Sequence, residues 1–217
     1  MAAYDLEEQE QLDNLKTWWK QYGNLVTWIL LAVSAAVAGY QVWNWYQRNQ
    51  SAQASHVFSV LQKAASEGDM QRVKAASGEL IEKFGGTPYG PLGAMLAGKL
   101  AFDKGDLKTA RAQLTWAADN ASDEVQDLAR VRLAAVLLDE KSYDEALKQV
   151  AAPKQASFTA RFAEMRGDVL LAQGKRGEAR EAYQTALAKA EDAKAGRAAA
   201  AYKELLQQKA DAVGDAQ

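Results

Sequence analysis

The sequence predicts an all-α protein: a single N-terminal transmembrane helix followed by a domain of repeated helical hairpins. Two observations carry this prediction, an uncharged apolar stretch near the N-terminus and a motif that recurs about every 34 residues after it. Composition agrees, because good helix formers such as Ala, Leu, Glu, Lys, Gln and Arg dominate the 217 residues, and the alternating β-branched runs typical of strands are missing.

The apolar stretch covers residues 21–47, which contain 27 residues and no formal charge. Its centre, residues 25–43, has 15 apolar or aromatic residues, and its polar members are Thr27, Ser34 and Gln41. A helix needs about 20 such residues to cross a bilayer. Both ends carry the aromatic residues that membrane interfaces favour, namely Trp18, Trp19 and Tyr22 before the centre and Tyr40, Trp43, Trp45 and Tyr46 at and beyond its end. We therefore expect a transmembrane helix over 21–47, in contact with the lipid bilayer.

A cleaved signal peptide is the alternative, because Ala36-Val37-Ala38 resembles a cleavage site after an apolar run. A signal peptide begins with a short basic region, whereas residues 1–20 hold five acidic side chains against Lys16 and Lys20. The apolar run also continues past Ala38 into aromatic residues. The sequence therefore favours a retained anchor.

Orientation follows from the basic residues that flank the span. Lys16 and Lys20 precede it and only Arg48 closely follows it, which favours an N-terminus in the cytoplasm. Residues 1–20 are then an acidic cytoplasmic tail, and residues 48–210 form a domain outside the cytoplasm, in a bacterium the periplasm. Within the span, Ala35 and Gly39 form a small-xxx-small pair that either contacts another helix or simply faces lipid.

The domain is electrically balanced, with 23 Lys and Arg against 23 Asp and Glu from residue 49 onward. This argues against nucleic acid as a partner, because nucleic-acid binding requires a concentrated basic face. Its length is sufficient for one domain with its own core.

Three segments of the domain repeat one pattern, in which a small residue lies twelve positions before an Ala. The pairs are Gly98 and Ala110, Ala134 and Ala146, and Gly167 and Ala179, and a polar turn separates the members of each pair: 104–106, 141–143 and 174–176. The Ala residues are 36 and 33 positions apart. This period and its helix–turn–helix content are typical of tetratricopeptide repeats. We expect the small residues to lie where the two helices cross, with Leu137, Leu170 and Tyr183 packed around them.

A weaker unit precedes these three, with a helix over 54–66, a turn at 67–69 and a helix over 70–84, with Val73 in place of Ala. The loop 85–91 ends that unit. A capping helix is expected over 197–209, with Ala201, Leu205 and Tyr202 as its packing residues, and residues 211–217 are expected to fray.

Candidate chemistry is weak throughout the chain. Residues 93–100 match most of a phosphate-binding loop, but Leu100 stands where magnesium needs Ser or Thr, and no strand precedes them. His56 is the only histidine and there is no cysteine, so a structural zinc site lacks its ligands. The acidic residues of the tail are dispersed along it, which indicates a solvated segment and not a cation-binding site. We expect no enzyme activity, no cofactor, no metal and no small-molecule substrate.

The concave face of such repeats usually binds the partner. By repeat position, the predicted contact residues are Met95, Lys99, Phe102, Val131, Leu138, Arg161, Glu164 and Asp168. Their mixture of apolar and charged side chains suits a peptide or a partner helix. Each apolar member could equally be ordinary core, whereas the three charged residues of the last repeat are expected to be exposed.

Several segments resemble a known family in their order along the chain: Trp19-Lys20-Gln21-Tyr22-Gly23-Asn24 entering the span, then Thr87-Pro88-Tyr89-Gly90-Pro91-Leu92, Arg132-Leu133-Ala134-Ala135-Val136, and residues 166–174, which begin Arg166-Gly167-Asp168. Together they resemble the YfgM-type proteins, ancillary subunits of the SecYEG translocon. The resemblance implies an N-in topology in the bacterial inner membrane and a periplasmic tetratricopeptide-like domain. It also implies association with SecYEG, the periplasmic chaperone PpiD and unfolded secretory proteins.

The function expected from the residues and the resemblance is non-enzymatic protein binding next to the translocon, linking emerging secretory proteins to periplasmic chaperones. The alternatives are a scaffold for another cell-envelope complex, such as cytochrome c maturation, and a membrane-anchored enzyme.

Overall fold

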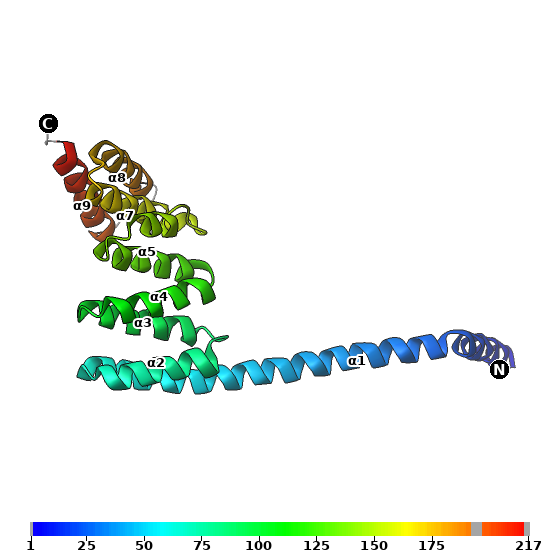
Figure 1. Ribbon diagram of the computed structural model, residues 1–217. Coiled ribbons are helices and arrows are strands. Elements are labelled where there is room, and N and C mark those ends of the chain that lie inside the picture. Colours follow the sequence, from blue (N-terminus) through cyan, green and yellow to red (C-terminus); the bar gives the residue numbers. More distant parts are fainter. Residues whose placement is uncertain (1, 192–196, 215–217) are drawn as a thin grey trace. The chain divides into compact units, whose positions relative to one another are not determined.

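The computed structural model describes residues 2–191 and 197–214, with side chains over 10–190 and 199–214. The chain forms two compact units, Met1–Asn49 and Gln50–Gln217. The described residues contain helices and turns and no strand, which confirms the predicted all-α class (Figure 1).

Helix α1 is the longest element, and its last residues, from Gln50 onward, belong to the second unit. The end of α1 forms a hairpin with α2, and the hairpins α3–α4, α5–α6 and α7–α8 follow, with a short 3₁₀ turn before α7 and α9 as the last helix. The bounds are α1 Ala2–Glu67, α2 Met70–Phe84, α3 Tyr89–Asp103, α4 Leu107–Asn120, α5 Asp123–Asp139, α6 Tyr143–Gln149, η1 Ala156–Phe158, α7 Thr159–Ala172, α8 Arg176–Glu191 and α9 Arg197–Gly214.

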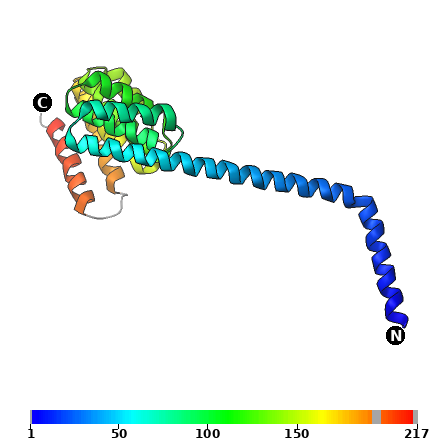
Figure 2. The ribbon, with the colours of Figure 1, turned by 90° about the horizontal axis from the view of Figure 1, so that it is seen from below.

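Neighbouring helices of the second unit pack as stacked hairpins. Each helix from α2 to α6 contacts the next one, as α7 contacts α8 and α8 contacts α9. The first helices of successive hairpins also touch, α3 against α5 and α5 against α7. Figure 1 shows these layers following one another in chain order, as in a helical solenoid, and Figure 2 views the stack from below, where the layers overlap.

Small residues make the close helix crossings, as the repeat pattern predicted. A Cβ added at Gly98 would lie 2.7 Å from Leu114 Cγ, and one at Gly167 would lie 2.5 Å from the Tyr183 ring. Ala110, Ala134, Ala146 and Ala179 are fully buried, and Leu137, Leu170 and Tyr183 are buried around them. These contacts confirm the predicted repeats.

The four hairpin turns share one backbone geometry. A residue one or two positions after the end of the first helix has a positive φ, namely Gly68 (73°), Gly105 (77°), Lys141 (59°) and Gly174 (79°). The next N–H donates back to a carbonyl five residues earlier, over 2.8–3.0 Å, from Asp69, Asp106, Ser142 and Lys175. This 6→1 bond is the Schellman ending of a helix, which glycine favours because it has no Cβ. Lys141 is the one non-glycine residue among the four.

Asp69 and Asp106 then begin the second helices of the first two hairpins. Asp69 accepts hydrogen bonds from the N–H groups of Gln71 and Arg72, and Asp106 accepts one from Thr109. The N–H and hydroxyl of Thr109 also lower the pKa of Asp106 below its usual value.

Two predicted boundaries were wrong, the start of α3 and the end of α9. Helix α3 begins at Tyr89, inside the predicted loop 85–91, because Pro91 occupies the first helical turn, where a missing N–H costs nothing. Helix α9 continues to Gly214, so residues 211–214 do not fray, and Val213 is 7% exposed. Residues 215–217 lie outside the described residues.

The buried face of α9 was also predicted one residue out of register. Ala201 is exposed and Leu205 is 44% exposed, whereas Leu206 is fully buried. Tyr202 is half-buried and packs as expected.

The first unit contains the apolar part of α1. This helix is long and apolar enough to cross a membrane, and none of its most apolar window is buried within the protein. The predicted candidate span is therefore present as a continuous helix whose side chains face outward.

Candidate protein-binding surface

The predicted contact residues all come from the first helices of their hairpins, α3, α5 and α7. The structure separates them into three groups: one core residue, a set at the edge of the core, and a set held by α9.

Met95 belongs to the core. It is 3% exposed and lies in the same apolar cluster as Ala94 and Leu133. Its predicted place on an open face was wrong, because Met95 lies on the side of α3 that packs inside the stack.

Phe102, Val131 and Leu138 lie at the edge of the same cluster, partly buried against it and partly open to solvent. Lys99 is exposed one turn before Phe102 and forms an ion pair with Asp103. Helices α3 and α5 therefore carry a mixed apolar and charged surface, formed by Lys99, Phe102, Val131 and Leu138, which we call the α3–α5 surface.

The three charged residues of α7 were expected to be exposed, and only Arg161 is. The Glu164 and Asp168 side chains are 13% and 23% exposed, because side chains of α9 cover them. Lys209 Nζ lies 2.9 Å from Glu164 Oε1 and 2.8 Å from Asp168 Oδ1.

Two tyrosines complete this cluster. The Tyr202 hydroxyl of α9 donates to Glu164 over 2.8 Å, and the Tyr183 hydroxyl of α8 donates to Asp168 over 2.7 Å. The Arg161 guanidinium stacks on the Tyr202 ring, 4.9 Å from its centroid. We call Glu164, Asp168, Tyr183, Tyr202 and Lys209 the α7–α9 network.

The surroundings of the α7–α9 network keep its two tyrosines neutral and its lysine charged. Burial raises the pKa of both tyrosine hydroxyls, Tyr183 and Tyr202, and the hydrogen bonds to Asp168 and Glu164 raise these values further. Burial alone would lower the pKa of Lys209, but its bonds to Asp168 and Glu164 outweigh burial, so the pKa of Lys209 is raised. The lysine stays charged and the phenols stay neutral, so the network links α9 to α7 over a wide pH range.

Sequence reasoning missed Lys209 and its role. The signal was a lysine on the apolar stripe of α9, which runs through Tyr202, Leu206, Ala210 and Val213. A charge in such a place requires a partner, and two acids one turn apart on α7 supply it.

Another exposed feature is a cleft on α4, which is the second helix of the α3–α4 hairpin. A shallow cleft of about 550 Å³ is lined by Lys108, Arg111, Trp116 and neighbouring residues of α4, together with Glu140. Arg111 crosses to Glu140 over 2.9 Å and to Glu145 over 2.6 Å, so its charge is already paired.

The weak chemical candidates have structural explanations. Residues 93–100 lie inside α3, where Gly93 approaches Leu80 and Gly98 approaches Leu114, so they form no phosphate-binding loop. His56 is exposed on α1. Within the described part of the chain, no group of three or more His, Cys, Asp or Glu side chains could hold a metal ion.

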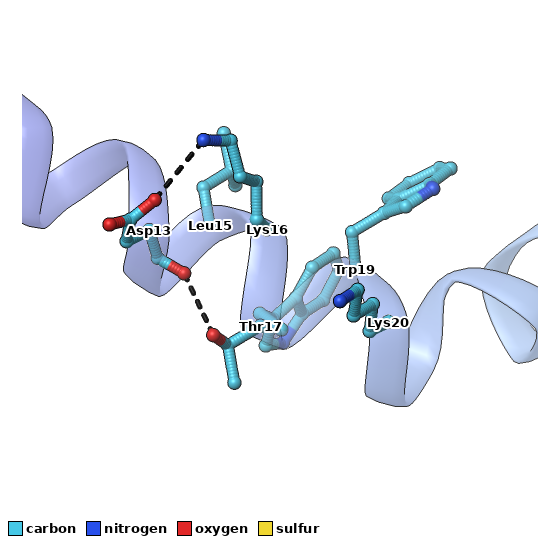
Figure 3. Close-up of a pocket in the computed structure, with 7 residues that line it drawn as sticks. Asp13, Leu15, Lys16, Thr17, Trp19 and Lys20 are labelled. Carbon is cyan, nitrogen blue, oxygen red and sulfur yellow. Dashed lines mark hydrogen bonds and ion pairs between the residues drawn. The ribbon is translucent and has the colours of Figure 1, made fainter.

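The start of the candidate span has its own local contacts, shown in Figure 3. Lys16 pairs with Asp13 over 3.1 Å, and the Thr17 hydroxyl donates to the Asp13 carbonyl. Trp19 folds over Gly23, where an added Cβ would lie 3.0 Å from its ring. Further along, Ala35 and Gly39 are exposed on α1, and the space around Gly39 is open.

Comparison with known proteins agrees with this architecture. A family model described as a tetratricopeptide repeat-like domain matches residues 16–215. The chain is 33% identical over 215 residues to the "Ancillary SecYEG translocon subunit" of Neisseria gonorrhoeae, covering 98% of this chain and 100% of that protein. It is 30% identical to the protein of the same name from Haemophilus influenzae and 31% identical to that from Escherichia coli. The coverage is 85% of this chain in both cases, and 90% and 88% of the relatives. The repeats, the candidate span and these full-length matches together show that the chain belongs to the family of ancillary SecYEG translocon subunits with a tetratricopeptide repeat-like domain.

Proposed function

We propose that the protein is a membrane-anchored, non-enzymatic binding subunit that associates with the SecYEG translocon and links emerging secretory proteins to a periplasmic chaperone of the PpiD type. The observation that carries the proposal is the match over 98% of this chain to a relative named as a translocon subunit, since it includes both the span and the repeats. The chaperone link rests on the family resemblance of the sequence.

The proposed topology places the N-terminus in the cytoplasm and the repeats in the periplasm. It is supported by Lys16 and Lys20 on the near side of the span against Arg48 on the far side. A single-cysteine experiment tests it, because the chain has no native cysteine. In intact cells, a membrane-impermeant maleimide should label Ser66→Cys but not Asn14→Cys. The reverse pattern would contradict the proposed topology.

The proposed mechanism is proximity. A span beside the channel confines the domain near its exit, which raises the effective concentration of the binding surface for emerging chains. The α3–α5 surface is the candidate contact, because Phe102, Val131 and Leu138 offer apolar area that α9 leaves open, with the Lys99 charge beside them. Such surfaces suit weak binding of extended or helical segments.

Affinity purification of the tagged full-length chain from detergent-solubilised membranes tests the proposal. SecYEG subunits and the chaperone should co-purify. Recovery of a different envelope complex without SecYEG would overturn the proposal and favour the scaffold alternative.

A photo-crosslinking amino acid then tests the surface. We expect adducts with secretory proteins from position 99, on the α3–α5 surface, and few from position 108, because Lys99 and Lys108 are both exposed but lie on different helices. Equal adducts from both positions would show that this surface has no special role.

A further inference from the structure

The polar residues of the apolar centre, residues 25–43, lie in a single line along α1. Thr27, Ser34 and Gln41 are the polar side chains of the apolar centre, and they are spaced seven residues apart. Lys20 and Arg48 continue the same spacing at the two ends. We call these five residues the polar seam.

A spacing of seven places side chains on one face of a helix. Seven residues fall about 20° short of two full turns, so Thr27, Ser34 and Gln41 span an arc of about 40° on a straight helix. Slight left-handed supercoiling around another helix removes this drift, which is why a seven-residue repeat is typical of helix–helix contacts. Ala35 and Gly39 lie about 100° and 140° further round from Ser34, on a different face.

The side chains of the polar seam are exposed, and only some of their polar groups form hydrogen bonds. All three central side chains are exposed. The Thr27 hydroxyl donates to its own helix at the Gly23 carbonyl over 2.8 Å. The Ser34 and Gln41 side chains make no hydrogen bond with any residue that the structure describes.

In the hydrocarbon core of the bilayer, the Ser34 hydroxyl and the Gln41 amide have no water with which to form hydrogen bonds. An unsatisfied hydroxyl or amide in the bilayer core is costly, and transmembrane helices meet this cost by bonding across to another helix. Ser34 lies at the middle of residues 25–43, about 13 Å from either end, so its hydroxyl cannot reach the interfaces.

The charges at the ends of the seam indicate which helix fits. A second copy of this chain in the same orientation would place Lys20 against Lys20 and Arg48 against Arg48 across the contact. Like charges at both ends disfavour that arrangement. A different helix, with Ser, Thr, Asn or Gln at the depth of Ser34 and Gln41, satisfies the amide and hydroxyl without this repulsion.

We propose that the polar seam is the docking face of the anchor for a transmembrane helix of another protein that presents hydrogen-bonding side chains. The proposal rests on the membrane anchor of the proposed function and deepens it, since it assigns which face of α1 meets the partner.

Photo-crosslinking in native membranes tests the face directly. A diazirine amino acid is placed in the full-length chain at 34 or 41, with 36 and 43 as controls. Ala36 and Trp43 lie two residues further on, at nearly the same depth and about 160° away round the helix. Adducts with another membrane protein should form from 34 and 41, and only lipid adducts from 36 and 43. Equal adducts from both faces, lipid adducts alone, or adducts of two copies of this chain would overturn the proposal.

Substitution then tests the chemistry. The variant Thr27→Val, Ser34→Ala, Gln41→Leu removes the polar groups and remains apolar enough to span. Its control, Ile29→Val, Ala36→Val, Trp43→Phe, alters the opposite face with the same spacing. Loss of the two interhelical bonds expected from Ser34 and Gln41 should reduce recovery of the co-purified partner about eightfold in the seam variant, with little change in the control.

Three outcomes are distinguishable. If the seam variant keeps its partner, the seam is not the docking face, although the proposed association stands. If both variants lose the partner equally, the contact does not depend on the seam. If the unaltered chain captures neither SecYEG nor another membrane protein, the proposed function itself fails. Amide exchange of the repeat domain checks that both variants fold.

Discussion

Replacing Lys209 with methionine should release α9 from α7, because Lys209 carries the central charge of the α7–α9 network. The substitution keeps the length of the side chain and removes three charge-assisted hydrogen bonds, at 2.9 Å to Glu164 and at 2.8 and 2.9 Å to Asp168. Glu164 and Asp168 would remain mostly buried, each with a tyrosine hydroxyl as its remaining partner.

The magnitude follows from burial. Removing one partner of a fully buried ion pair costs about 3–5 kcal/mol. The side chains here are 27%, 13% and 23% exposed for Lys209, Glu164 and Asp168, so water screens part of the loss. We expect about 2–3 kcal/mol, or a 30- to 150-fold larger opening constant for α9.

Hydrogen–deuterium exchange of the full-length chain in nanodiscs measures this opening. Peptides covering residues 199–214 should exchange faster in Lys209→Met, while those from α3 to α5 should not change. The triple variant Glu164→Gln, Asp168→Asn, Lys209→Met should recover part of the loss, because its neutral groups leave no unpaired charge. A change below about threefold in Lys209→Met would refute the reasoning and assign the attachment of α9 to Leu206, Ala210 and Val213.

The same network should weaken in alkali. The folded-state pKa values of Tyr183, Tyr202 and Lys209 all lie above their unfolded values of 10.0 and 10.5. The folded protein therefore binds more protons than the unfolded chain above about pH 10, and stability falls as pH rises. Above about pH 10, exchange in 199–214 should accelerate more than the intrinsic chemical rate does. Lys209→Met should show a smaller pH dependence; an unchanged one would refute the role of Lys209.

Three further substitutions, two of them with a control variant, test the packing of the repeat domain by thermal or denaturant unfolding of the full-length protein. Gly167→Ala should cost about 1–3 kcal/mol, because its Cβ would lie 2.5 Å from the Tyr183 ring, whereas Gly177→Ala, with open space around it, should be neutral or slightly stabilising. Leu206→Ala should cost about 2–4 kcal/mol and Leu205→Ala under 1, since Leu206 is fully buried and Leu205 is 44% exposed; equal costs would contradict the register of α9. Asp127→Ala should cost about 3 kcal/mol, because this buried carboxylate holds two backbone N–H groups; a cost under 1 would refute that role.

Asp127 also explains part of the fold that the repeat pattern did not predict. Helix α6 ends at Gln149, after only seven residues, and the chain then runs through 150–158 to α7. Asp127 accepts the N–H groups of Lys154 and Gln155 over 3.1 and 2.8 Å. The carbonyls of the same segment bond to Arg130 and Arg166. These hydrogen bonds join residues that are 15 to 28 positions apart. A 34-residue repeat pattern does not indicate contacts at that spacing, so the segment could not be predicted from it.

The repeats themselves were predictable because their signal is steric. A small residue and an Ala twelve positions apart allow two helix axes to approach, whatever surrounds them, so the hairpins follow from local spacing alone. The turns were predictable for the same reason, since a glycine with positive φ ends the first helix in three of the four hairpins.

The exposure of the candidate binding residues could not be predicted as well, because it depends on what the last helix covers. Helix α9 also carries alanine on several faces, and these alanines obscure the apolar stripe formed by Tyr202, Leu206, Ala210 and Val213. The spacing of that stripe favours Leu206 over Leu205, and the sequence interpretation overlooked it. Lys209 helps to fix which face of α9 is buried, because it binds Glu164 and Asp168, which lie 45 and 41 positions earlier in the chain. The charged residues of α7 that resembled a partner site are thereby occupied by the chain itself.

Because α9 covers Glu164 and Asp168 of α7, it changes where a partner could bind. In a tetratricopeptide array every first helix could in principle contribute to one continuous binding face. Here the α7 end of that face is covered by Tyr202 and Lys209, so the apolar area left for a partner lies on α3 and α5. Lys209→Met should therefore do more than destabilise α9, since it frees two carboxylates at the end of the α3–α5 surface. Basic client segments should then crosslink from position 161 in the variant and not in the unaltered protein. If crosslinks from 161 stay absent while exchange in 199–214 rises, the α7 face is not a binding surface even when it is uncovered.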